Sequence, residues 1–566
     1  MHTSNDLRGA LRTIDRRSYP AYKSLAGRWS FGRYVLSVDH VQGDPFAAPS
    51  SLSLRVDHRE AGFPAAYWDG ENRIALADYL LRRFARQADR FCFQAKGSGK
   101  SGLINLSRCG QEILQRSACE VNREGIVLRF AVGFPANGRT INAGELEKIL
   151  FDFLPVCAQE SLFFQRTPKE ELESAIFLAE DQRFIRRELD RLDLVAFVAD
   201  GAVLPRESGV SDRPMKDAVA FRAPETLAVT LDLPHRGPLR GMGVRRGITV
   251  IAGGGYHGKS TLLKALERGV YDHIAGDGRE YVITDRTALK IRAEDGRKVT
   301  STDISLFINH LPNGRDTTRF STLDASGSTS QAANIVEGIE AGSRVLLLDE
   351  DTSATNLMVR DQLMQRVISR DKEPITPFLE RAADLYAQAG VSLILVVGSC
   401  GDYFRIAHQI IQMDAYRAVD IIQRTRELLG DAPIPAAPDF CLPMGTRTID
   451  LSGAIQTRKN YRGNGYVKER LKIRRSGKTA FSLGQEELDL RYVEQLVDAE
   501  QTTALAHLLR YAKENFGGQP TEVKTVVLAL EKLLEERGFQ GVCGENVPAG
   551  LARPRIQEIF ACFNRY

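Results

Sequence analysis

The sequence predicts an α/β fold: a central P-loop domain, preceded by a mixed α/β domain and followed by a small α+β domain. Two observations carry this prediction. The apolar run Ile248–Ile251 leads into the glycine-rich stretch Gly253–Thr261, and a helical pattern follows it. A second apolar run, Arg344–Leu348, ends in the carboxylates Asp349 and Glu350. Buried parallel strands end in this way where their carboxyl ends meet a ligand.

The glycine-rich stretch is typical of a phosphate-binding loop. Its backbone N–H groups can curve around a phosphate chain, and the N-terminus of the following helix adds its positive end. We expect Lys259 to reach the β- and γ-phosphates and Ser260 to ligate Mg²⁺. The alternative is a turn without a ligand, which would require the motif and both flanks to agree by accident. The residues predicted to bind the nucleotide are Gly253, Gly254, Gly255, Tyr256, His257, Gly258, Lys259, Ser260 and Thr261.

A second Gly-Lys-Ser sequence lies upstream, in Gln94–Ser101. Glutamine stands there in place of the first loop glycine, and Gly102–Leu106 alternates like a strand instead of opening a helix. These features favour a β-turn, with a second phosphate site as the alternative.

The two carboxylates at the end of the second apolar run suit metal-assisted hydrolysis. Asp349 is expected to hold Mg²⁺ through water, and Glu350 to orient and deprotonate the attacking water. Such a strand resembles a Walker B strand, although ordinary core strands also end in acidic residues.

The segment Asp324–Gln331 precedes that strand and places small residues at the start of a predicted helix. Ser326, Gly327 and Ser328 there are typical either of a phosphate contact or of an ordinary serine N-cap. ATP-binding-cassette (ABC) ATPases carry a Ser-Gly-Gly-x-x-Gln signature at this place, which the segment resembles except at the second glycine. Ser353–Asn356 resembles the D-loop of the same class.

Further motifs extend the resemblance along the chain. With Phe307–Pro312, Glu373–Pro377 and the N-terminal Asp39–Ser50, the sequence resembles the soluble "predicted ATPase of the ABC class" family. The resemblance implies an N-terminal domain, an ABC-class P-loop ATPase domain and a C-terminal domain, with ATP as the nucleotide and RNA or another nucleic acid as partner. We place these domains at residues 1–170, 171–440 and 441–566.

One loop differs in sequence from the corresponding loop of ABC transporter ATPases. After the predicted strand Val391–Val397, the loop Gly398–Asp402 lacks a switch histidine. Ser399 can hydrogen-bond the γ-phosphate but cannot carry the charge of an imidazolium. Asn309 best matches the Q-loop glutamine, on a shorter side chain. These two differences predict slow or partner-stimulated hydrolysis.

Length and composition limit the class of protein that the chain can be. The 566 residues are 43% hydrophobic and 26% charged, as in globular proteins, and the length leaves room for about three or four domains. No run approaches the roughly 20 apolar residues of a membrane span, and the N-terminus lacks an apolar signal segment. The eight cysteines form no Cys-x-x-Cys pair, which argues against zinc. We therefore expect a cytoplasmic protein.

Basic residues gather in two places although the net charge is only +4. The predicted helix Ile74–Ala88 carries Arg82, Arg83, Arg86 and Arg90 at helical spacing, and a strand is predicted before it at Trp29–Asp39. Another helix is predicted at Ala143–Phe153, and a hairpin with the arms Leu471–Arg475 and Thr479–Leu483 is predicted in the C-terminal region. Residues 447–478 contain ten Lys or Arg against two acids. Cations interleaved with Tyr461 and Tyr466 suit RNA or single-stranded DNA, whereas the alternative is a solvated linker. The predicted nucleic-acid contacts are Arg458, Lys459, Arg462, Arg470, Arg474 and Arg475.

Two classes of function follow. The first is an ABC-class ATPase that binds and hydrolyses ATP with Mg²⁺ as a homodimer and couples the cycle to RNA or single-stranded nucleic acid. The second is a regulatory or protein-remodelling ATPase whose basic surfaces meet acidic protein partners.

Overall fold

The computed structural model describes residues 2–359, 367, 372–430, 440–442, 445–453, 455–459 and 466–566, with the backbone alone at 455–459 and 466–469. The chain divides into two compact units, one of Met1–Glu180 with Arg537–Arg553 and one of Asp181–Glu536 with Pro554–Tyr566. These units do not correspond one for one to the three predicted ranges, so the boundaries near residues 170 and 440 stay predictions. No helix among the described residues is long and apolar enough to span a bilayer.

The first unit is built on a seven-stranded sheet of order β1-β2-β3-β4-β8-β5, with β7 also paired to β8. Its long strands are antiparallel, and β4 shows the alternation expected of a sheet: Leu52, Leu54 and Val56 are buried. The strands are β1 His2–Thr3, β2 Gly27–Ser30, β3 Val35–His40, β4 Ser50–Asp57, β5 Ile104–Asn105, β7 Cys119–Val121 and β8 Gly125–Val132.

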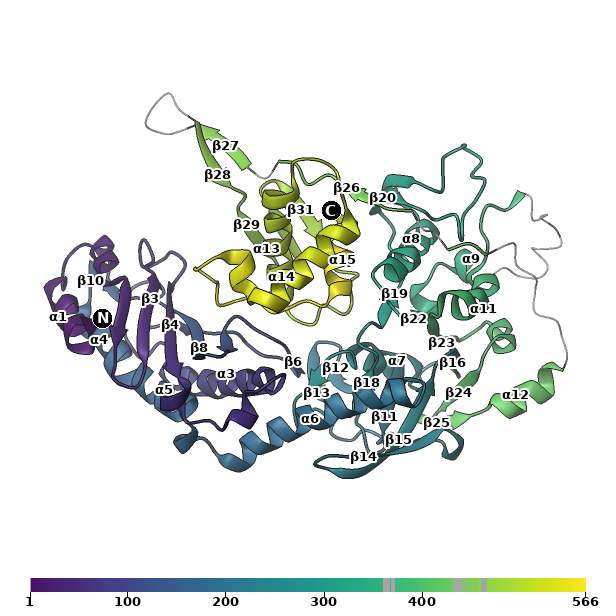
Figure 1. Ribbon diagram of the computed structural model, residues 1–566, viewed down its shortest axis with the longest axis horizontal. Helices are drawn as coiled ribbons and strands as arrows, with labels where there is room; N and C mark the ends of the chain where they lie inside the picture. Colours follow the sequence, from purple (N-terminus) through teal and green to yellow (C-terminus); the bar gives the residue numbers. More distant parts are fainter. Residues whose placement is uncertain are drawn as a thin grey trace. The chain divides into compact units, whose positions relative to one another are not determined.

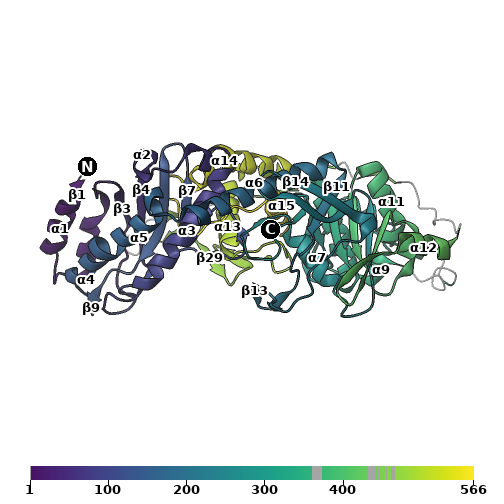
Figure 2. The same ribbon diagram turned by 90° about the horizontal axis from the view of Figure 1, so that it is seen from below.

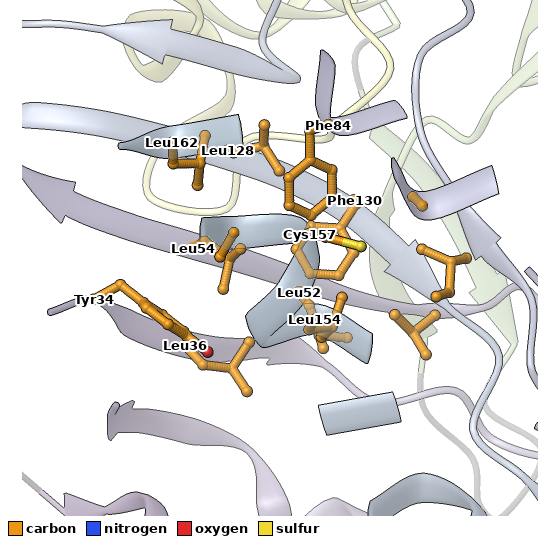
Figure 3. Packing of buried hydrophobic residues seen from close by; sticks show 14 of the residues in the cluster. Tyr34, Leu36, Leu52, Leu54, Phe84, Leu128, Phe130, Leu154, Cys157 and Leu162 are labelled. Carbon is orange, nitrogen blue, oxygen red and sulfur yellow. The ribbon is translucent and has the colours of Figure 1, made fainter. Parts of the chain in front are cut away.

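Helices cover this sheet and close its core. The helices are α1 Ser4–Thr13, α2 His58–Ala61, α3 Asn72–Phe91, α4 Ala143–Glu147, α5 Leu154–Leu162 and α6 Lys169–Arg191, which continues into the second unit. Both ribbon views show α3 beside α5 (Figure 1, Figure 2). In the core, Phe84 of α3 meets Phe130 of β8 with ring centroids 5.6 Å apart, among leucines of β3, β4 and α5 (Figure 3).

Two sequence predictions for this unit need correction. The strand predicted at Trp29–Asp39 is two antiparallel strands, β2 and β3, because the chain turns at Gly32, whose φ of +78° favours glycine. The helix predicted at residues 143–153 is α-helical only to Glu147, and Lys148–Phe153 form a π-helical turn. Pro155 follows this turn and lacks the N–H that a regular α-helix would use there.

The second unit contains a six-stranded sheet of order β19-β22-β23-β16-β24-β25. All neighbouring pairs in it are parallel except β24 with β25. Figure 1 shows β22, β23, β16 and β24 side by side. The strands are β16 Ile248–Ala252, β19 Leu289–Ile291, β22 Val345–Asp349, β23 Ser392–Val396, β24 Gln409–Asp414 and β25 Arg417–Asp420. Every residue of β16, β22 and β23 is buried, which explains why all but one residue of each strand is apolar.

Helices and smaller sheets complete this part of the unit. The helices are α7 Lys259–Arg268, α8 Gly327–Glu340, α9 Thr355–Met358, α11 Phe378–Ala389 and α12 Ile422–Leu429. An antiparallel sheet joins β14 Ala228–Leu233, β15 Gly237–Arg245, β11 Leu194–Ala199 and β18 Val282–Thr284, and a hairpin joins β20 Arg297–Thr302 to β21 Phe320–Ala325.

The rest of the second unit comes from the C-terminal region. The hairpin predicted at residues 471–483 is confirmed as β29 Ile473–Ser476 and β30 Ala480–Leu483, with β31 Glu486–Asp489 as a third strand. The helices are α13 Ala499–Phe516, α14 Val523–Cys543 with a non-helical break at Gly538, and α15 Ile556–Arg565; from Arg537 onward, α14 belongs to the first unit. Two further pairs join β26 Thr448–Ile449 to β32 Thr521–Glu522 and β27 Ile455–Lys459 to β28 Tyr466–Arg470.

The packing in Figure 3 makes the first unit sensitive to loss of a core ring. Phe130→Ala removes a fully buried side chain, and we expect the free energy of unfolding of this unit to fall by about 3–5 kcal/mol. Urea unfolding of the purified protein measures this loss. Glu124→Ala, at an exposed position beside the same strand, is the control and should change little. Equal stability of the two variants would contradict the packing described.

Candidate functional site

The glycine-rich loop joins β16 to α7, as predicted. Gly253 has a φ of +140°, and a Cβ there would lie 2.4 Å from the Met413 carbonyl oxygen, so only glycine fits. Gly258 has a φ of +97° and is the N-cap of α7, which begins at Lys259. Tyr256 between them also has a positive φ and is fully exposed. The loop thus has the left-handed turns that aim backbone N–H groups at an anion.

Lys259 reaches over this loop. Its ammonium donates to the carbonyl oxygens of Gly253 and Gly254 at 2.7 and 2.8 Å. The cation therefore lies beside the N–H groups that would hold phosphate.

A hairpin fixes the loop from the other side. The N–H of Ala415, between β24 and β25, donates to His257 Nδ1 at 3.0 Å, and the N–H of Tyr416 donates to the His257 carbonyl oxygen at 3.2 Å. Asp414 Oδ1 lies 3.2 Å from the same His257 nitrogen. His257 thus supports the loop through the hairpin.

Asp349 lies at the end of β22 and next to Ser260. Burial raises the pKa of the Asp349 carboxyl group, although the charge of Lys290 and hydrogen bonds from the Asp351 N–H and the Ser260 hydroxyl favour the ionised form. The residues fit a hard cation, since a hydroxyl and a carboxylate oxygen are the ligands that Mg²⁺ takes from protein. Among the described residues no cluster of three His, Cys, Asp or Glu could hold a metal alone, so phosphate and water would complete the shell.

Glu350 points to the loop that follows β23. Its Oε2 accepts hydrogen bonds from the N–H groups of Gly398 at 2.6 Å and Ser399 at 3.0 Å, and its Oε1 accepts one from the Ser399 hydroxyl. Burial raises the pKa of the Glu350 carboxyl, but these hydrogen bonds outweigh it and hold the pKa below its ordinary value. A Cβ on Gly398 would lie 3.9 Å from Glu350 Oε2 and 4.0 Å from Lys259 Nζ, so Gly398 lies between the Glu350 carboxylate and the Lys259 ammonium.

The signature segment begins α8. Ser326 is its N-cap: the hydroxyl is exposed and accepts from the Thr329 N–H at 3.4 Å. Gly327 is partly exposed, whereas Ser328 is buried and therefore faces the interior. Gln331, fully buried, donates to Ser353 Oγ at 3.1 Å and accepts from the Ala354 N–H at 2.7 Å. The signature helix is thereby tied to the segment that follows Glu350.

In the described part of the chain, the hydrogen bonds of Asn309 go to residues outside this site. Its amide nitrogen donates to the Ser305 carbonyl oxygen, and its backbone N–H donates to the Pro374 carbonyl oxygen at 2.8 Å. The match of Asn309 to the Q-loop glutamine stays a prediction.

Two neighbours of the site were not predicted. Lys290, on β19, is directed toward Asp349 and donates to Thr352 Oγ1 at 3.3 Å. The sequence gives no signal for it, because a single lysine in a strand belongs to no motif. Tyr416 has a φ of +68° without being glycine, and its side chain lies near Gly258, where a Cβ would come within 3.2 Å of it. Only the folded hairpin brings it there.

The predicted basic residues are only partly described. Arg462 lies outside the described residues, as does the neighbouring Tyr461, and the side chains of Arg458 and Lys459 on β27 are not described either. Arg470 is 72% exposed and lies 3.3 Å from a Glu514 oxygen. Arg474 and Arg475 are exposed on β29.

The four arginines at helical spacing on α3 do not form one exposed basic face, because two of them point into the structure. Arg83 is buried and donates to the carbonyl oxygens of Glu160 and Arg166. Arg82 is paired with buried Asp78 at 2.6 Å. Only Arg86 and Arg90 remain on the exposed side. Helical spacing alone could not show that α5 and its flank cover Arg83, or that Arg82 bonds to Asp78 and to the Glu112 carbonyl oxygen.

Comparisons with known proteins cover nearly the whole chain. An ABC ATPase P-loop domain model matches residues 168–437, a model described as ATPase of the ABC class N-terminal matches residues 4–165, and an MRB1590 C-terminal domain model matches residues 472–566. An uncharacterized protein of Methanocaldococcus jannaschii is 30% identical over 271 residues, 46% of this chain and 59% of that protein. The chain thus spans about three fifths of that relative's length.

Solved ATP-binding cassettes also match the chain, with lower sequence identity. One is cbiO1 from Clostridium perfringens, described as part of the ABC transporter complex cbiONQ, at 13% identity, covering 42% of this chain and 92% of that chain. Another is the ADP conformation of an ATP-binding cassette of an ABC transporter, at 10% identity, covering 43% of this chain and 96% of that chain. Both TM-scores are 0.26, too low to support a conclusion.

The matched models and the fold confirm the predicted class, an α/β P-loop domain flanked by an N-terminal and a C-terminal domain. The chain therefore contains a segment that matches an ABC ATPase P-loop domain, preceded by one that matches the N-terminal domain of ATPases of the ABC class and followed by one that matches an MRB1590 C-terminal domain.

Proposed function

We propose that this protein binds and hydrolyses ATP with Mg²⁺ at a composite site of a homodimer, and couples the cycle to RNA or single-stranded nucleic acid. One observation carries the proposal: Lys259, Ser260, Asp349 and Glu350 meet at one edge of the parallel sheet. A cation for phosphate, two oxygen ligands for a metal and an ionised carboxylate are the groups that phosphoryl transfer to water needs.

Each group has one task. The loop N–H groups and Lys259 hold and orient the phosphates. Ser260 and Asp349 would hold Mg²⁺, which when bound supplies positive charge to the phosphate oxygens. Glu350 takes the proton of the attacking water, and its lowered pKa keeps it ionised at neutral pH.

The contact between Glu350 and the loop at Ser399 supports slow basal turnover. Three hydrogen bonds from Gly398 and Ser399 occupy the carboxylate that would otherwise accept from water. Hydrolysis requires Ser399 to turn from Glu350 toward the γ-phosphate. Serine offers a hydroxyl there but no positive charge, so a partner or nucleic acid that moves this loop would stimulate the reaction.

The proposal of a homodimer rests on the exposed signature. Ser326 is exposed at the N-terminus of α8, and the chain carries one P-loop and one signature segment. In the ABC arrangement, the signature of one protomer closes on phosphate held by the P-loop of the other. Two chains related by a twofold axis would therefore complete two sites.

The nucleic-acid partner is supported by charge and exposure. Arg474 and Arg475 are exposed on β29, and Arg470, four residues earlier in the chain, is largely exposed. Exposed cations can displace counterions from a phosphate backbone. An acidic protein partner is the alternative, and nucleic-acid binding distinguishes the two.

Glu350→Gln tests the catalytic assignment. We expect ATP and Mg²⁺ binding to persist while hydrolysis falls by roughly 10²- to 10⁴-fold, because glutamine cannot accept the proton of water. Single-turnover hydrolysis and fluorescent-nucleotide binding measure the two effects. Lys259→Ala is the contrasting variant and should weaken nucleotide binding itself. Parental hydrolysis by Glu350→Gln would mean that another carboxylate, with Asp351 the next candidate, is the base.

Mixing two inactive variants tests the composite site. Lys259→Ala and Ser326→Arg should each be inactive, and their mixture should recover part of the activity because some heterodimers keep one intact site. ATPase assays after mixing, with heterodimers demonstrated by affinity tags, measure the recovery. Absence of recovery when heterodimers are present would refute action of Ser326 on the partner's nucleotide.

Neutralising the six predicted basic residues together tests the nucleic-acid partner. Binding of homopolymeric RNA and single-stranded DNA should weaken, and its salt slope should fall by roughly 0.7 for every phosphate that the protein no longer neutralises. ATP binding should persist. Neutralising Arg491 and Lys532, which are 66% and 73% exposed elsewhere in the C-terminal region, is the control. Unchanged affinity and salt slope for nucleic acid would favour an acidic protein partner instead.

A further inference from the structure

The C-terminal region contacts both helices that begin at the phosphate-binding motifs. Helix α7 starts at Lys259, and α8 starts after Ser326. Residues from 447 onward reach α8 through a buried cluster of charges and reach α7 through a separate set of polar contacts. All of these residues belong to the second unit.

The cluster at α8 contains three arginines and three glutamates, so its formal charges balance. The side chains of Arg447, Glu337 and Arg565 are only 7%, 3% and 9% exposed. Charges this deeply buried need partners with good geometry, and their directional bonds fix how the elements carrying them are oriented. The members are Glu294, Arg297, Glu337, Glu340, Arg447 and Arg565.

Arg447 links the last two turns of α8 to the C-terminal helix. Its guanidinium lies 2.5 Å from Glu340 and 3.5 Å from Glu337, both on α8. It also donates to Asn564 Oδ1 of α15 at 2.6 Å. One buried side chain therefore joins α8 to α15.

Arg565 makes a second link nearer the signature. It pairs with Glu294, with Nε to Oε2 at 3.1 Å, and donates to Asn334 Oδ1 of α8 at 3.3 Å. The Glu294 backbone N–H donates to Ser330 Oγ at 2.8 Å, in the first turns of α8. The second link thus reaches to within four residues of Ser326.

The contacts to α7 involve other residues. Glu494 lies 3.1 Å from the ammonium of Lys264, and the Gln495 amide donates to the Glu267 carbonyl oxygen at 3.1 Å. The Tyr271 hydroxyl, just beyond α7, donates to the Gln495 carbonyl oxygen at 2.9 Å. The P-loop helix is therefore held to the same C-terminal region as the signature helix.

We propose that Arg447 and Arg565 are positioning residues for hydrolysis: they fix α8 relative to α7 and so set where Ser326 is presented. The C-terminal domain is then part of the ATPase machinery and not an appended binding module. Movement of this domain by a partner would move the signature. The proposal rests on the role proposed for Ser326, whereas the rigidity of α8 can be measured without it.

The paired variant Arg447→Met with Glu340→Gln tests the proposal, because it removes both charges of one contact and leaves Glu494 and Gln495 in place. We expect nucleotide affinity within about twofold of the parent, turnover lowered roughly ten- to a hundredfold as reacting groups are misplaced, and faster amide hydrogen exchange over residues 327–340. Arg491→Met is the matched control, since Arg491 is 66% exposed and pairs with Asp489. It should change none of the three quantities.

The exchange measurement is made without nucleotide, so it decides the proposal even if the parent protein proves inactive. Exchange over α8 equal to that of Arg491→Met would overturn it. So would a loss of nucleotide affinity as large as the loss of turnover, because the cluster would then be only structural. Should the paired variant not fold, Arg565→Lys keeps the charge but cannot bridge Glu294 and Asn334 together. Parental turnover and α8 exchange in that variant would equally contradict the proposal.

Discussion

Parallel pairing of β22, β23 and β16 is the constraint on which the nucleotide site depends. Val396 of β23 is in register with both Ile251 and Asp349, so the three strands end at the same level. The glycine loop, the two carboxylates and the loop at Gly398 are thereby brought to one edge from distant parts of the sequence. A slip of one residue would turn Asp349 to the other face of the sheet and separate it from Ser260.

The parts of this site that could be predicted are those whose structure depends on consecutive residues. A strand, a glycine loop and a helix occupy consecutive residues at 248–268, and each needs only its own backbone preferences. The strand ending in Asp349 is equally local, because burial on both faces demands an unbroken apolar run. The N-cap at Ser326 is local as well, because a serine side chain before a helix can accept from the first free N–H groups.

The features that could not be predicted depend on contacts between residues far apart in the sequence. Arg447 belongs by sequence to a basic stretch, yet it is buried against Glu337 and Glu340, which precede it by about a hundred residues. Arg83 has the spacing of an exposed face, but backbone carbonyls of a later segment take up its guanidinium. Neither composition nor periodicity contains these pairings, because tertiary packing alone decides which face of a helix is covered.

The interrupted first unit bears on how the protein is made. Residues of Arg537–Arg553 complete that unit, where the Leu551 N–H donates to Ser117 Oγ and that hydroxyl donates to the Pro548 carbonyl oxygen at 2.6 Å. Synthesis of the intervening Asp181–Glu536 takes roughly 20 to 70 seconds at ribosomal rates of about 5–20 residues per second. During that time the first unit lacks residues 537–553 and cannot complete its fold. A nascent chain with an incomplete unit exposes surface that chaperones bind.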